Sequence, residues 1–125
     1  MDNTTNALNW FEIPVKDFDR AKAFYENTFQ VKLNRLESPD VELWAFPMQP
    51  QASGSPGAIV KMTGKSSGIG GTIVYFSCAD CSVEEDRACK SGGQIQRAKF
   101  SIGEYGFISL VLDPDGNIIG LHSRQ

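Results

Sequence analysis

The residues that could take part in chemistry are few. Three cysteines, Cys78, Cys81 and Cys89, fall within one short stretch, and His122 is the single histidine of the chain. The Cys78-x-x-Cys81 spacing occurs in zinc and redox sites, but a structural zinc needs four ligands and the sequence has no second cysteine pair. An odd number of clustered cysteines favours reduced thiols, so we expect this motif to mark a strand end and a helix start.

The composition is typical of one folded domain, which we expect to span residues 1–125. Hydrophobic residues make up 41% and charged residues 22% of the 125 positions. Twelve Lys and Arg against fifteen Asp and Glu give a net charge of −3 without a basic cluster, which argues against a nucleic-acid partner. No apolar run approaches the roughly 20 residues that cross a bilayer, and the first residues lack signal-peptide character. We expect a cytoplasmic protein with no membrane partner.

The first half of the chain has the pattern of a strand, a helix and three further strands. Residues 8–15 alternate in polarity, with Trp10 and Glu12 on the face opposite the apolar one. Asp17 is a suitable N-cap for a helix over residues 18–29, whose aromatic stripe we expect to be buried on the first strand. The three strands are expected at residues 31–37, 41–48 and 58–62.

The second half repeats this order. A strand is expected at 72–78, and Ser82 with Glu85 has the capping-box pattern that opens a helix running to Ser91. The last strands are expected at residues 94–100, 105–112 and 117–123, with an Asp-Pro-Asp-Gly turn at 113–116 before the final one. Two βαβββ modules, about 8–62 and 71–123, predict an α+β fold in which curved mixed sheets surround a cavity. The glycine-rich segment 63–71 would link them, and such a cavity is a common place for a small-molecule ligand.

Three motifs carry a family resemblance through their order and spacing: FEIPV at 11–15, AKAFY at 21–25 and DPDGNIIGLH at 113–122. With them, residues 8–123 resemble the vicinal-oxygen-chelate (VOC) proteins, which include glyoxalases, bleomycin-resistance proteins and dioxygenases. The similarity is greatest to the short subgroup related to lactoylglutathione lyase. The resemblance implies the glyoxalase/bleomycin-resistance fold and a homodimer. Open sheet edges and thirteen aromatic residues are consistent with a dimer.

The resemblance also implies four inward positions that hold His, Gln or Glu in metal-dependent members, where a divalent ion polarises the substrate. By register these positions are Trp10, Lys61, Ile73 (or Thr72) and Gly120. An indole only donates, isoleucine and glycine have no ligating side chain, and a lysine would have to lose its proton. We therefore expect no metal, no cofactor and no metal-dependent activity.

Other inward side chains could form a site in place of a metal. The register that turns Trp10 inward also turns Glu12 inward, with Tyr75 as its counterpart in the second module. Lys61 and His122 are expected on the inward face of the last strands. The candidate ligand-binding residues are Trp10, Lys61, Ile73, Tyr75 and, on a strand whose face we cannot assign, Trp44. The candidate catalytic residues are Glu12 and His122.

Two functions are compatible with these residues. The first is metal-free binding of a small, planar or anionic molecule, as in the antibiotic-sequestering branch of the family. The second is a lyase or isomerase in which Glu12 or His122 moves a proton. Simpler explanations stay open: Glu12 and Lys61 could neutralise each other, Trp10 could be a core residue, and the domain could be purely structural.

Overall fold

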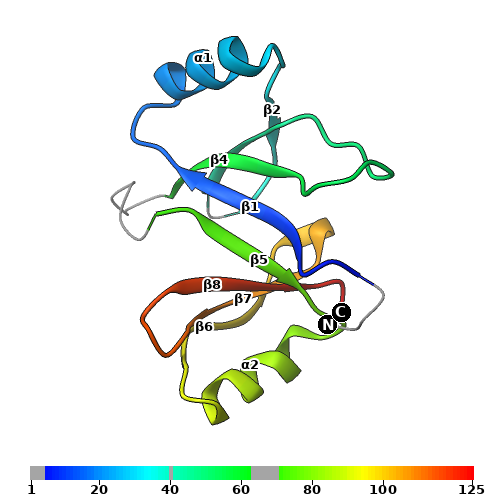
Figure 1. Ribbon diagram of the computed structural model, residues 1–125, viewed down its shortest axis with the longest axis vertical. Coiled ribbons are helices and arrows are strands. Elements are labelled where there is room, and N and C mark those ends of the chain that lie inside the picture. The colour runs from blue at the N-terminus through cyan, green and yellow to red at the C-terminus, as the bar shows by residue number, and fades with distance from the viewer. Residues whose placement is uncertain (1–4, 40, 63–70) are drawn as a thin grey trace. The chain divides into compact units, whose positions relative to one another are not determined.

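The computed structural model describes residues 5–39, 41–62 and 71–125, and the side chain of Met62 lies outside this description (Figure 1). The chain divides into two compact units, residues 10–72 and residues 1–9 with 73–125. The expected linker, residues 63–71, lies almost wholly outside the described residues.

The unit of residues 10–72 contains one helix and four strands. Its strand order is β2-β3-β4-β1, with β1 and β4 parallel and the other neighbours antiparallel. Strand β2 is shorter than expected because residues 31–33 are not part of it. The elements are β1 (Leu8–Pro14), α1 (Phe18–Phe29), β2 (Asn34–Leu36), β3 (Val41–Ala45) and β4 (Gly57–Met62).

The remaining unit repeats this arrangement. Its strand order is β5-β8-β7-β6, again with the first and last strands parallel, and α2 lies along β6, β7 and β8 (Figure 1). The α+β fold with two βαβββ modules is thus confirmed. The elements are β5 (Ile73–Ser77), α2 (Cys81–Lys90), β6 (Gln94–Ser101), the 3-10 turn η1 (Gly103–Tyr105), β7 (Phe107–Leu112) and β8 (Ile118–Ser123).

Helix α1 begins where the sequence predicts but is covered less than expected. The Asp17 side chain accepts a hydrogen bond from the Arg20 N–H at 3.1 Å, which confirms the N-cap. The expected burial of the aromatic stripe is wrong: within α1, all of which the structure describes, no residue is buried, and Phe24 and Phe29 are 59% and 60% exposed. Within the stripe, Tyr25 packs edge-on against Phe46, which directly follows β3.

Helix α2 does not start with the expected capping box. Asp80 is the N-cap, and its carboxylate accepts from the Ser82 N–H at 3.0 Å, so the helix already begins at Cys81. The carboxylate of Glu85 bonds to groups of β6 and β7 instead of returning to the helix start. A capping box is a local pattern, and here longer-range partners compete successfully for Glu85.

Each unit has a small apolar core. In the first, Leu43, Ala45, Ala58 and Val60 form one buried cluster, which Trp10 contacts. In the second, Cys81, Val111 and Leu121 are buried between α2 and the strands. None of the helices in the described parts of the chain is long and apolar enough to cross a membrane.

The difference between fully buried Ile59 and exposed Phe24 predicts losses of stability of different size on truncation. Ile59→Ala should lower the free energy of unfolding by about 2–5 kcal/mol, because it removes a buried side chain and leaves a cavity. Phe24→Ala should lower it by less than about 1 kcal/mol, as is usual for exposed positions. Urea denaturation measures both. Equal losses would mean that Phe24 is covered in solution.

Candidate functional site

Trp10 and Glu12 form a hydrogen-bonded pair on one face of β1. The indole Nε1 donates to the Glu12 Oε2 at 3.0 Å. Glu12 is only 8% exposed, and the register places it beside Ala58, a member of the apolar cluster that Trp10 contacts. A buried carboxylate needs hydrogen-bond donors to offset its lost hydration, and the indole supplies one. The structure therefore brings together two of the expected site residues around one carboxylate.

Lys61 does not join this pair. Val60 pairs with Pro14 and so shares the face of Trp10 and Glu12, whereas the next residue, Lys61, projects from the opposite face and is exposed. Glu12 pairs with Ala58, and its counterpart Tyr75 pairs with Gly120. Ala58 is therefore the counterpart of Gly120, whereas the sequence predicted Lys61, three residues later. The residue types along a strand do not show which residues of the neighbouring strand they pair with.

Trp44 can now be assigned to a face. It pairs with Ile59, on the side of the strands that faces α1, and the Lys22 Nζ of that helix lies 3.6 Å from the indole ring centre. Trp44 is thus on the face opposite Trp10, where a cation already covers its ring.

Four of the expected residues share one face in the other unit. Because Tyr75 pairs with Gly120 and Ser77 pairs with His122, the side chains at 73, 75, 120 and 122 alternate onto the same side of β5 and β8. Ile73 and Tyr75 are both buried, and Tyr75 is only 3% exposed. A Cβ atom at Gly120 would lie 2.1 Å from a ring carbon of Tyr75. Position 120 therefore has no room for a metal-ligating side chain while the Tyr75 ring is in place.

His122 is held by both of its ring nitrogens. Its Nε2 lies 2.7 Å from the Tyr105 carbonyl oxygen, and its Nδ1 lies 3.1 Å from the Asn9 side-chain nitrogen. A carbonyl can only accept, so Nε2 carries the proton and Nδ1 accepts from the Asn9 amide. For His122 to act as a base through Nδ1, Asn9 would have to move away.

The residues at the implied metal positions do not fit a divalent ion. Trp10, Ile73 and Gly120 offer no lone pair, and Lys61 lies on the other face of its strand. Across residues 5–39, 41–62 and 71–125, no group of three or more His, Cys, Asp or Glu residues is arranged to hold a metal ion.

The three cysteines are free. Cys81 is the first residue of α2 and is fully buried, while Cys78 directly follows β5. Burial raises the pKa of the Cys78 thiol to about 11, with a smaller contribution from the nearby Glu84 carboxylate. A thiol that stays protonated at neutral pH is a poor nucleophile and a poor metal ligand. These placements agree with the expectation of a strand end and a helix start.

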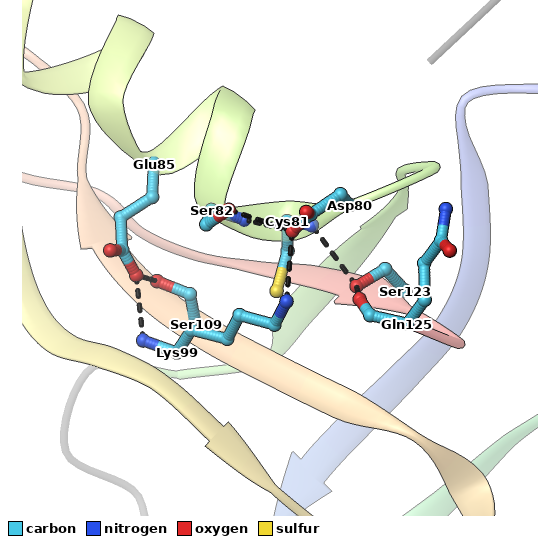
Figure 2. Close-up of polar contacts among 8 residues, drawn as sticks. All are labelled: Asp80, Cys81, Ser82, Glu85, Lys99, Ser109, Ser123 and Gln125. Atoms are coloured by element: carbon cyan, nitrogen blue, oxygen red, sulfur yellow. Dashed lines mark hydrogen bonds and ion pairs between the residues drawn. The ribbon is translucent and has the colours of Figure 1, made fainter.

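A polar cluster beneath α2 was not found from the sequence. Figure 2 shows Lys99 between two carboxylates: its Nζ donates to Asp80 at 2.9 Å, and its backbone N–H donates to Glu85 at 2.7 Å. The hydroxyl of buried Ser109 also contacts Glu85. The capping residue Asp80 was the available signal, but its partner Lys99 is nineteen positions away. The cluster ties the start of α2 to β6 and β7.

This cluster predicts a specific acid response. The hydrogen bond from Lys99 is the main cause that lowers the pKa of Asp80 from 3.8 to about 2. A depressed carboxylate pKa adds stability that is fully present above pH 3.8 and is lost as the pH falls through about 2. Lys99→Met should therefore lower the urea midpoint at pH 7 and flatten its pH dependence between pH 4 and 2. Lys90→Met, in the exposed Lys90–Asp86 pair, is the matched control, and an equal change in both variants would contradict the prediction.

Comparison with known proteins agrees with the observed fold. A methylmalonyl-CoA epimerase from Mycobacterium tuberculosis is 15% identical, over 95% of this chain and 88% of that one, with a TM-score of 0.70. A Streptomyces coelicolor methylmalonyl-CoA epimerase in complex with 2-nitronate-propionyl-CoA is also 15% identical, over 94% of both chains, with a TM-score of 0.68. A hypothetical protein from Bacillus halodurans is 12% identical, over 94% of both chains, with a TM-score of 0.70.

At these identities the likeness to solved structures shows the fold alone. No curated protein sequence matches the chain significantly. The model of the Glyoxalase/Bleomycin resistance protein/Dioxygenase superfamily matches residues 7–121, nearly the whole chain. The chain therefore belongs to the glyoxalase/bleomycin-resistance/dioxygenase superfamily.

Proposed function

We propose that the chain binds a small planar molecule, without a metal, at the face of β1 that carries Trp10 and Glu12. The observation that carries this proposal is the buried hydrogen-bonded pair of indole and carboxylate beside an apolar cluster. An indole ring provides a flat surface for stacking, and a carboxylate has two oxygens that together accept up to about four hydrogen bonds. Glu12 could thus accept from a ligand as well as from Trp10.

The position of Lys61 bears on which charge the ligand would carry. An anionic molecule was expected because Lys61 would have faced it, but Lys61 lies on the other side of its strand. The charged side chain on the Trp10 face of β1 is the carboxylate of Glu12. A buried carboxylate disfavours an anion and favours N–H and O–H donors. We therefore propose a neutral or cationic planar ligand that donates hydrogen bonds.

Trp10 can report on binding directly. In a Trp44→Phe background it is the sole tryptophan, because the chain has only two. We expect quenching of its fluorescence and a raised melting temperature with some members of a library of planar heteroaromatic amines. A ligand at 100 times its Kd adds about 2.7 kcal/mol of stability.

Variants test where such a compound binds. Glu12→Gln should weaken binding about tenfold, which corresponds to about 1.4 kcal/mol. Lys61→Gln is the control, because it removes a charge from the opposite face of the same unit. A compound whose affinity depends on Lys61 and not on Glu12 would sink the proposal.

A proton-transfer enzyme is the second candidate. It is favoured by the same buried Glu12, since a carboxylate on an apolar face can act as a general base. The structural likeness to methylmalonyl-CoA epimerases supports an isomerase over a lyase. Wash-in of solvent deuterium at an acidic C–H of branched acyl thioesters, followed by NMR, tests it. Loss in Glu12→Gln would assign the base to Glu12, and loss in His122→Gln alone would assign it to His122.

Both proposed functions operate without a metal ion, so we expect little metal in the purified protein. The purified chain should contain much less than one divalent ion per molecule, because Trp10, Ile73 and Gly120 have no ligating group and Ala58, which takes the place expected for Lys61, has none either. Elemental analysis measures this. One tightly held ion per chain, lost on substituting residues of the Trp10 face, would contradict the prediction.

We also propose a homodimer, supported by the exposed aromatic rings of Phe24 and Phe29 and by the open edge strand β6. A cytoplasmic location and a closer relationship to the lactoylglutathione-lyase subgroup stay predictions.

A further inference from the structure

The side-chain oxygen of Asn9 has an unusual environment. Asn9 Oδ1 is buried and, among the described residues, has no hydrogen-bond partner. A buried carbonyl left without a donor destabilises the fold, because it has lost its hydration. Such atoms are rare in folded proteins, so this one calls for a physical reason.

The reason lies in the protonation state of His122. The Tyr105 carbonyl fixes the proton on Nε2, so Nδ1 is the nitrogen that can gain or lose a proton. While Nδ1 is unprotonated, it accepts from the Asn9 amide nitrogen at 3.1 Å, and the amide must point its oxygen away from the ring. Within the described residues, Oδ1 is therefore left without a partner as a direct consequence of neutral His122.

We propose that Asn9 and His122 form a two-state proton-sensing pair. When a proton from solvent binds Nδ1, the ring nitrogen becomes a donor and can no longer face the amide N–H. A half-turn of the Asn9 amide then brings Oδ1 to Nδ1, where it accepts the new hydrogen bond. The amide oxygen and nitrogen are nearly equal in size, so this exchange requires no movement of the backbone.

The surroundings of His122 make Asn9 the partner that responds. Its strand neighbours are Ser77 on β5 and Ile108 on β7, neither of which titrates near neutral pH. On the other elements, the phenol of Tyr75 lies on the same face of β5, and Tyr105 meets the ring through its carbonyl.

Two charged residues lie close in sequence to these contacts: Glu104, which precedes Tyr105, and Arg124, two residues after His122. Both are exposed, and Arg124 donates to the Glu104 carbonyl. Within the described residues, the imidazole nitrogens form hydrogen bonds with Asn9 and Tyr105, and neither partner is a carboxylate.

The pair has two consequences. The hydrogen bond between Asn9 on β1 and His122 on β8 persists in both protonation states, whereas a side chain that can only donate would lose it when Nδ1 is protonated. As the pH falls, the Asn9 amide nitrogen, a hydrogen-bond donor, takes the buried position that the acceptor Oδ1 occupies at higher pH. Backbone hydrogen bonding next to the pair, from the Ser77 N–H to the Ala7 carbonyl at 3.0 Å, should be unaffected by this change.

NMR of the untagged, 15N-labelled protein tests the proposal without a ligand. The chain has one histidine, so its ring signals are unambiguous. At pH 8 we expect the Nε2–H form. Between pH 8 and 5 we expect the Asn9 side-chain amide signals to shift with the same midpoint as Nδ1, while the Ser77 amide stays protected from exchange.

An acidic substitution provides the matched comparison. Asn9→Asp offers two acceptor oxygens and a negative charge, so it should raise the His122 midpoint by roughly one pH unit. Asn6→Asp adds the same charge at an exposed position of the same segment and should change the midpoint much less.

Two results for the ring would overturn the proposal: a proton on Nδ1 instead of Nε2 at pH 8, or a ring that stays neutral down to pH 5 in folded protein. Asn9 amide signals that do not shift during the His122 titration, or equal shifts of the His122 midpoint in the two variants, would also overturn it. Because no ligand is used, these results are independent of whether the chain binds a planar molecule.

Discussion

The parallel pairing of the first and last strands of each module is the constraint on which the other features depend. In both modules an aromatic ring on the first strand lies over a glycine on the last. Phe11 pairs with Gly57 and Tyr75 pairs with Gly120, and a Cβ at either glycine would lie 2.3 or 2.1 Å from the ring. A slip by one residue would place a side chain under each ring and would turn every side chain to the opposite face. The ring and the glycine together therefore fix the register.

This register decides what chemistry the chain can perform. In one module it places Trp10 and Glu12 beside Ala58 and directs Lys61 to the other side. In the other module it fills the space at position 120 with the ring of Tyr75. The family's divalent ion has no ligand set among these residues. The polar pairs on these faces include a carboxylate bonded to an indole and an imidazole bonded to an amide.

Much of the fold could be predicted from the sequence because it depends on short-range patterns. The N-cap Asp17 and the turn at Asp113 are examples, since the Asp113 carboxylate accepts from the Asp115 and Asn117 N–H groups within the same turn. The family model and the βαβββ order agree with expectations that came from the spacing of such motifs.

The errors arose where distant residues decide the outcome. Lys61 was placed on the wrong face because the pairing of β4 with β1 cannot be read from either strand alone. Phe24 was expected to be buried because helical periodicity shows which residues share a face but not how much of it is covered. Glu85 was assigned to a capping box, but Lys99 and Ser109, remote in sequence, bond to it. The shared face of Trp10 and Glu12 was predictable because alternation along a single strand suffices to bring the two side chains together.

The most direct test of this account is a thermodynamic double-mutant cycle between Tyr75 and Gly120. If the Tyr75 ring takes the space of a side chain at position 120, Gly120→Ala should lower the free energy of unfolding by about 1–3 kcal/mol in the wild-type background. In a Tyr75→Leu background the same substitution should cost much less, which gives a coupling energy of about 1 kcal/mol or more. Costs that add independently would contradict the claim that this ring sets the register and excludes a metal ligand at position 120.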